Sequence, residues 1–153
     1  MPTPEERLQE LGVSLPAPAT PVAAYVPCVR TGDLVYVSGQ VPMVDGKPSH
    51  LGHLGDDVDL EAGRAAARTC AVNVLAALKA ELGELSRVRR VVKVTGFVAS
   101  TADFTDHPKV VNAASELFGD VFGDAGRHAR AAVGVPALPL GVPVEVEAIV
   151  EVA

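Results

Sequence analysis

Two segments near the end of the chain contain residue types that can bind and react with a small organic acid. Arg130 lies in the run Ala129–Val135, and Glu145 and Glu147 lie in the run Val142–Val152. A guanidinium can hold a carboxylate through two charge-assisted hydrogen bonds, and a carboxylate can accept a proton from an attacking water. These types indicate an anchor for an acidic ligand beside a proton acceptor.

The spacing of these residues predicts which side of a sheet each one faces. In the last run, apolar residues alternate with Glu145 and Glu147, as in a strand with one buried face. In the preceding run, Ala132 and Gly134 alternate in step with Arg130 and would leave space for a ligand or another subunit. We therefore expect Arg130 and Glu145 on one polar, uncovered face. The alternation alone favours a simpler interpretation, an ordinary cross-strand ion pair in water.

Five strand patterns and two long helix patterns must position these residues. Asp59 is the expected N-cap of the first helix, whose apolar positions recur every three or four residues from Ala67 to Leu85. The second helix is expected over Asp106–Phe122, with Pro108 in its first turn. The expected strands are Tyr25–Arg30, Leu34–Ser38, Val88–Val98, Ala129–Val135 and Val142–Val152. The order ββαβαββ predicts an α+β two-layer sandwich, a mixed sheet with both helices on one face.

The remaining segments are expected to be an arm and a loop. Residues 1–21 combine a short helical pattern with a proline-rich stretch and are interpreted as an N-terminal arm, so that residues 22–153 form one domain. Asp45–Asp57 holds three glycines without periodicity and predicts a long surface loop. His50 and His53 in it have a metal-ligand spacing, but a flexible polar loop is favoured because no helix fixes that spacing, so no metal is expected.

Composition disfavours several classes of protein. The 153 residues include 13 basic and 19 acidic ones, a net charge of −6, and no tryptophan, whereas nucleic-acid binding needs clustered cations and aromatic residues. No apolar run approaches the roughly 20 residues of a membrane span, and the N-terminus lacks the features of a signal peptide. Cys28 and Cys70 are far apart and are expected to be reduced. We expect a cytoplasmic protein that binds neither nucleic acid nor membrane.

Several motifs, taken together, resemble the RidA (YjgF) family, formerly labelled endoribonuclease L-PSP. The resemblance extends from about Tyr25 to Val152. The motifs are Tyr25, Val37-Ser38-Gly39-Gln40-Val41-Pro42, Val111-Asn112-Ala113, Ala129-Arg130-Ala131-Ala132-Val133 and Val144-Glu145-Val146-Glu147-Ala148. The resemblance implies a chorismate-mutase-like fold and a homotrimer whose sheets face inward, with three ligand clefts between subunits.

The family activity implied by this resemblance is the hydrolysis of reactive 2-imino or enamine acids to 2-keto acids and ammonia, without a cofactor. The resemblance assigns the substrate carboxylate to Arg130 and the positioning of water to Glu145. It assigns other positions of the pocket to Tyr25, Ser38, Gly39 and Asn112. Many family members have a cysteine where this chain has Ala132, which indicates a divergent subgroup.

Two other functions remain open at this point. A binding module for a keto acid or another small carboxylate, acting as a metabolite sensor or chaperone-like protein, would use the same arginine cleft. An endoribonuclease or translation inhibitor, the older label of the family, would need an acid and a base such as His107 and His128. The acidic charge argues against that activity, and the two histidines are better interpreted as a helix-start residue and a loop residue.

Overall fold

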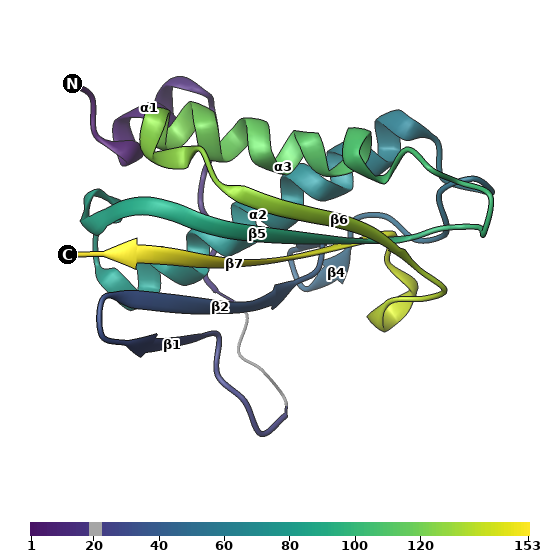
Figure 1. The fold of residues 1–153 in the computed structure, drawn as a ribbon, viewed down its shortest axis with the longest axis horizontal. Coiled ribbons are helices and arrows are strands. Elements are labelled where there is room, and N and C mark those ends of the chain that lie inside the picture. Colours follow the sequence, from purple (N-terminus) through teal and green to yellow (C-terminus); the bar gives the residue numbers. More distant parts are fainter. Residues whose placement is uncertain (19–22) are drawn as a thin grey trace.

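Alternating β-branched residues build the sheet at the centre of the structure, a computed structural model that describes residues 1–18 and 23–153. The strands are β1 (Cys28–Thr31), β2 (Leu34–Gln40), β5 (Val88–Ala99), β6 (Ala129–Val135) and β7 (Val144–Val152). Their order across the sheet is β1-β2-β7-β5-β6 (Figure 1). Only β5 and β6 run parallel, and the other neighbouring pairs are antiparallel. This order places β6, which carries Arg130, at one edge.

Two long helices, α2 (Leu60–Leu82) and α3 (His107–Phe122), lie side by side on one face of the sheet (Figure 1). The Asp59 carboxylate accepts a hydrogen bond of 2.8 Å from the N–H of Ala62, which confirms the predicted N-cap. Gly83 and Gly123, with φ of 84° and 63°, follow the last turns and end the helices. No helix in the described part of the chain is long and apolar enough to cross a bilayer.

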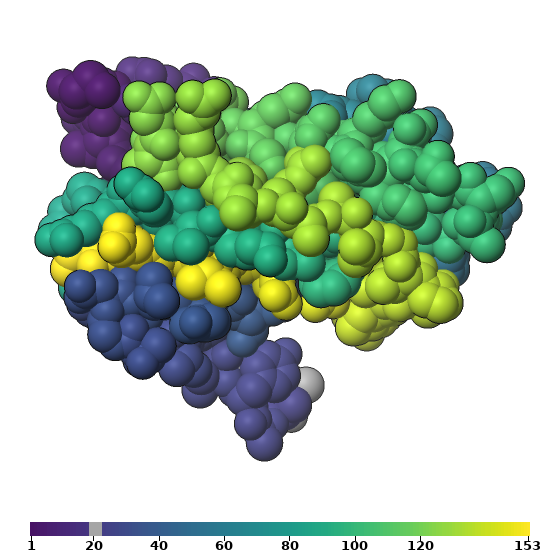
Figure 2. Space-filling view, in the orientation of Figure 1, coloured from purple at the N-terminus to yellow at the C-terminus, as the bar shows by residue number. Residues whose placement is uncertain are grey.

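The core lies between these helices and the valine face of the sheet. The five apolar residues of β7 that alternate with its polar residues, from Val144 to Val152, are at most 3% exposed. They pack with Val94 and Val98 of β5 and with the apolar side of the two helices. The α+β two-layer sandwich with both helices on one face is therefore confirmed. The strands form the visible surface of the opposite face, which no helix in the described part of the chain covers (Figure 2).

The predicted loop over Asp45–Asp57 is more ordered than its composition suggested. It includes part of a short hairpin, β3 (Met43–Val44) and β4 (Lys47–Pro48), whose turn residues Asp45 and Gly46 have φ of 52° and 79°. Leu54 further along is fully buried in the core. The expectation of a long surface loop was therefore wrong in part, because this segment contains a strand of a short hairpin and one apolar residue that is buried in the core.

The N-terminal residues pack against the helical layer. Helix α1 (Pro4–Glu10) begins with a capping box between Thr3 and Glu6, and its Leu8 is 3% exposed. The Glu5 carboxylate accepts hydrogen bonds of 2.8 Å from the Lys79 ammonium and from the N–H of Leu85. The helical pattern is confirmed, whereas part of the predicted proline-rich stretch lies outside the described residues. Short 3-10 turns complete the connections at η1 (Leu85–Arg87), η2 (Gly123–Gly126) and η3 (Pro139–Gly141).

Gly96 lets α3 approach the sheet closely. It lies in β5 beneath Val111, and a Cβ at this position would overlap the Val111 side chain. Gly119, which lies on α3, differs because a Cβ there would meet nothing within 4 Å. The first glycine is therefore required by packing, and the second is not.

We expect Gly96→Ala to lower the free energy of unfolding by about 1–3 kcal/mol, because the methyl group overfills the contact with Val111. Urea unfolding at a fixed protein concentration measures the effect. Gly119→Ala is the matched control, with a change between zero and a gain of about 1 kcal/mol from helix propensity. Adding Val111→Ala should make the double variant more stable than the sum of the single changes predicts. Strict additivity would show that this contact does not limit the approach of α3.

Candidate active site

Arg130 lies on the helix side of the sheet, not on the uncovered face. In the parallel pairing of β6 with β5 it is opposite Val94, which is fully buried under the helices. Its Nη1 donates hydrogen bonds to Asn112 Oδ1 at 2.7 Å and to Ser115 Oγ at 3.2 Å, both on α3. The prediction that Arg130 shares a face with Glu145 was wrong.

The cause of this error is the composition of β6. Its residues are small or apolar on both sides, so alternation separates two sets of residues without saying which set faces the helices. The register with β5 decides, and it turns Arg130, Ala132 and Gly134 toward α3. The space expected beside Gly134 is also occupied, because a Cβ there would overlap His107 Nε2.

A chain of hydrogen bonds fixes Arg130 against α3. His128 Nδ1 lies 2.7 Å from the carbonyl oxygen of Gly126, so this nitrogen carries the proton. His128 Nε2 therefore accepts from Ser115 Oγ at 2.9 Å, and the serine oxygen accepts in turn from Arg130. Burial lowers the pKa of His128 and the nearby Arg130 charge lowers it further, opposed by the bond to Gly126. The imidazole is thus neutral at physiological pH, and the partners of Arg130 carry no charge.

This half-buried guanidinium has no counter-charge among residues 1–18 and 23–153. The ion pairs within 4.0 Å in that part of the chain are Arg30–Asp33, Glu5–Lys79, Arg64–Glu116 and Asp106–Lys109. A partly desolvated cation with neutral partners is stabilised by any anion that reaches it. The geometry around Arg130 therefore suits an acidic ligand.

The backbone of β6 adds a hydrogen-bond donor beside Arg130. The N–H of Ser100 donates to the carbonyl of Val135 across the β5–β6 pair. Because ladder bonds involve alternate residues of each strand, the N–H groups of Ala132 and Gly134 point away from β5, toward the outer edge of the sheet. An anion at this edge can therefore meet both a guanidinium and an amide N–H.

Glu145 lies on the uncovered face, as predicted. It pairs with Phe97 of β5, while its neighbours Val144 and Val146 face the core. Burial raises the pKa of the Glu145 carboxyl, and the adjacent charge of Glu147 raises it further. A carboxylate with a raised pKa is a stronger proton acceptor than one in water.

Gly39 and Ser38 adjoin Glu145 at an irregularity in β2. The regular pairing of β2 with β7 is interrupted between Val37 and Gln40, and a Cβ on Gly39 would overlap the Glu145 carboxylate. Ser38 Oγ donates to the carbonyl of Val26 at 2.7 Å and so holds the segment before β1. Tyr25 in that segment is 58% exposed and precedes the observed β1, which is shorter than the expected strand.

The predicted site residues therefore form two groups, which lie apart from each other within a single chain. Arg130 and Asn112 lie at the β6 edge on the helix side, and Ser38, Gly39 and Glu145 lie at the β2–β7 pair. Val94 of β5 pairs with Arg130 on one side and with Ala148 of β7 on the other. Glu145 is three residues from Ala148, and β7 lies two strands away from β6. Sequence reasoning also missed Ser115, and it interpreted His128 as a loop residue without connecting it to Arg130. Ser115 follows Asn112 by one helical turn, a signal that would have placed it near Arg130 had the register of β6 been known.

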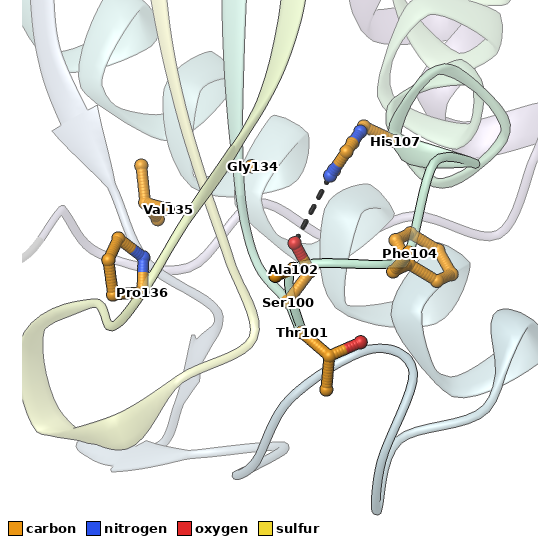
Figure 3. A pocket seen from close by; sticks show the side chains of 8 residues that line it. All are labelled: Ser100, Thr101, Ala102, Phe104, His107, Gly134, Val135 and Pro136. Atoms are coloured by element: carbon orange, nitrogen blue, oxygen red, sulfur yellow. Dashed lines mark hydrogen bonds between the residues drawn. The ribbon is translucent and has the colours of Figure 1, made fainter.

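A cavity of about 390 Å³ lies at the other end of β6, where β5 ends and α3 begins (Figure 3). His107 Nε2 and Ser100 Oγ are 3.1 Å apart in its wall, and the His107 ring packs edge-on against Phe104. The two side chains lie directly against Gly134, where a Cβ would overlap them. Their contact holds the first residue of α3 at the end of β5. Its position confirms His107 as a helix-start residue and separates it from Arg130.

The remaining chemical candidates are engaged elsewhere. His50 Nδ1 lies 2.8 Å from Ser49 Oγ, and His53 Nε2 lies 2.8 Å from the carbonyl of Pro136. Among the described residues, no three His, Cys, Asp or Glu side chains are grouped as metal ligands. Burial, with a contribution from Glu81, raises the pKa of Cys28 to about 11, so this thiol is protonated at neutral pH.

Comparison with known proteins identifies the family. The family described as "YjgF/chorismate_mutase-like, putative endoribonuclease" matches residues 5–152. Protein TCP17 of Trypanosoma cruzi is 49% identical, over 94% of this chain and 91% of that protein. A 2-iminobutanoate/2-iminopropanoate deaminase of Salmonella typhimurium is 36% identical, over 87% of this chain and 90% of that protein. A crystal structure from Agrobacterium tumefaciens, of unknown function, is 50% identical with a TM-score of 0.91, and covers 98% of this chain and 92% of that one. The chain therefore belongs to the YjgF/chorismate mutase-like family, which its motifs resemble.

Proposed function

We propose that this protein is a cofactor-independent deaminase that hydrolyses 2-imino and enamine acids to 2-keto acids and ammonia. The observation that carries the proposal is Arg130, a half-buried guanidinium with only neutral partners at an open sheet edge. The relative of Salmonella typhimurium, named as a deaminase of 2-iminobutanoate and 2-iminopropanoate, supports the same chemistry.

In the proposed reaction, Arg130 binds the substrate carboxylate and so fixes the position of the neighbouring imine carbon. The imine is already electrophilic, and orientation of a water beside it supplies much of the rate increase. Water attacks the protonated imine, and Glu145 accepts a proton as the water oxygen bonds to carbon, giving a neutral carbinolamine. Glu145 then returns this proton to nitrogen and takes the hydroxyl proton as the C–N bond breaks, so that ammonia leaves, the keto acid remains and the last proton passes to solvent.

The proposed site is completed between two subunits of a homotrimer. Arg130 and Glu145 face opposite sides of the sheet in one chain, so a single substrate can meet both only across an interface. The uncovered face also carries the apolar side chains of Val29, Tyr36 and Val133, which are 54%, 46% and 43% exposed. Burying such side chains against another copy is favourable by about 25 cal/mol per Å² of apolar surface. An inward-facing arrangement of the sheets satisfies both requirements.

Two alternatives give different results in the same assays. A binding module would bind a keto acid through Arg130 without releasing ammonia from any imine. An endoribonuclease, which the family description includes, would cleave RNA without added imine. Assays of ammonia release and of RNA integrity with one metal-free preparation therefore separate the three functions.

Arg130→Gln should lower kcat/KM for 2-iminobutanoate at least about 100-fold, because an amide cannot replace the paired ionic hydrogen bonds to the carboxylate. The substrate is generated in situ by an amino-acid oxidase, and the keto acid is followed in competition with semicarbazide. Lys47→Gln, an exposed change of the same charge in β4, is the control and should retain wild-type activity. Unchanged turnover in Arg130→Gln would reject the proposed anchor.

Mixing two inactive variants should restore activity if the site lies between subunits. Trimers assembled from equal amounts of Arg130→Gln and Glu145→Gln chains should contain an intact Arg130–Glu145 pair at about a quarter of their interfaces, by random association in a ring. The mixture is refolded together and assayed for keto acid, with the separately refolded variants as controls. No recovery in co-assembled trimers would mean that the two residues do not share an intersubunit site.

The pH profile should depend on Glu147. If Glu145 is the proton acceptor, kcat falls as the pH drops through its raised pKa, because the protonated carboxyl cannot accept a proton. Glu147→Gln removes a neighbouring negative charge, lowers the pKa of Glu145 and should move this acid limb to lower pH. The profile is measured with the spontaneous hydrolysis subtracted at each pH. If the acid limb lies at the same pH in both proteins, the titration that causes it belongs to a group other than Glu145.

A further inference from the structure

A second cavity, of about 330 Å³, opens beside Arg130 where α3, η2 and β6 meet. It is lined by Ser115, Gly119, Gly126, Arg127, His128 and Arg130. The lining therefore contains two arginines and neutral hydrogen-bonding groups, and it contains no carboxylate. A pocket of this composition has a positive potential that favours anions.

Neither arginine of this cavity is neutralised within the described residues. The ion pairs there involve other side chains, and Arg130 uses Asn112 and Ser115 as neutral partners. Arg127, three residues before Arg130, is exposed and also lines the cavity. A small ligand held by Arg130 would therefore lie at a cavity that a second cation also lines.

Two glycines give the cavity its shape. Gly126 cannot be replaced without displacing backbone, because a Cβ there would overlap the carbonyl oxygen of Phe118. Gly119 has no such constraint, since a Cβ at this position of α3 would meet nothing within 4 Å. The absence of a side chain at Gly119 thus leaves open space in the cavity that Arg127 and Arg130 also line, and packing alone does not require this space.

We infer that this cavity accepts a second acidic group of the substrate, so that the preferred substrates are 2-imino dicarboxylic acids of four or five carbons. This inference rests on the proposed function, in which Arg130 binds the carboxylate next to the imine. The distant carboxylate is bound by Arg127 and takes no part in the reaction, and the bond changes at the imine carbon are those given above. Arg127 is therefore a specificity residue.

Binding of two non-reacting keto acids of equal chain length tests the inference. Isothermal titration calorimetry with 2-oxoglutarate and with 2-oxopentanoate compares ligands that differ in the second carboxylate. The wild-type protein should bind 2-oxoglutarate roughly tenfold more tightly or better, the effect of one added charge-assisted hydrogen bond. The preference should weaken as the salt concentration rises, because Arg127 is exposed.

Three variants and one control variant separate this inference from the proposed function. Arg127→Gln should remove the preference for 2-oxoglutarate and leave binding of 2-oxopentanoate unchanged. Gly119→Leu should weaken 2-oxoglutarate selectively by filling the cavity, with a melting temperature at or above that of the wild type. Arg130→Gln should weaken both ligands, and Lys47→Gln should weaken neither.

The outcomes are distinct. Equal affinity of the wild-type protein for both keto acids, with loss of both in Arg130→Gln, would overturn the dicarboxylate inference and leave the anchor role of Arg130 intact. A preference for 2-oxoglutarate that survives Arg127→Gln would also overturn it. Binding of both ligands that survives Arg130→Gln would instead contradict the proposed function.

Discussion

The arrangement around Arg130 depends on one electrostatic constraint, a partly buried positive charge whose partners in the chain are all neutral. The Asn112 amide oxygen and the Ser115 hydroxyl accept hydrogen bonds from the guanidinium without neutralising its charge. A carboxylate at either position would form an internal ion pair, and a ligand anion would then have to compete with it. Because an amide and a hydroxyl occupy these positions, Arg130 is held in place and its positive charge can still bind an acidic ligand. His128 extends the same logic, because its low pKa keeps a second charge away from the guanidinium.

The fold supplies this environment through one parallel strand pair. The β5–β6 register turns Arg130 toward α3 and leaves alternate amides of β6 at the sheet edge. Gly96 allows α3 to lie close over β5, which brings Asn112 and Ser115 within hydrogen-bond distance of Arg130. The contact between His107 and Ser100 fastens the beginning of the same helix. Packing of α3 at several points along its length therefore sets the position of a side chain at the sheet edge.

Some features of this fold can be predicted from the sequence and others cannot, and the strength of the local sequence signal decides which. The alternation in β7 separates valines from glutamates, so one face is identified by hydrophobicity, and Glu145 was placed correctly. The helices were located by N-cap and glycine signals that act within one turn. In β6, small or apolar residues occupy both sides, so hydrophobicity carries no information about the direction of Arg130. Only pairing with β5, a contact between residues about 36 positions apart, resolves it.

The separation of Arg130 from Glu145 connects assembly to chemistry. In one chain the two side chains face opposite sides of a sheet, and no rotamer change moves a side chain of a central strand such as β7 through the backbone. A reaction that uses both residues on one substrate therefore requires a second copy, so in the proposed mechanism subunit association is a condition of catalysis. The exposed apolar side chains on the Glu145 face give a driving force for association on the side where the second residue is needed. A substitution that loosens this face would then reduce activity without touching a residue that contacts the substrate.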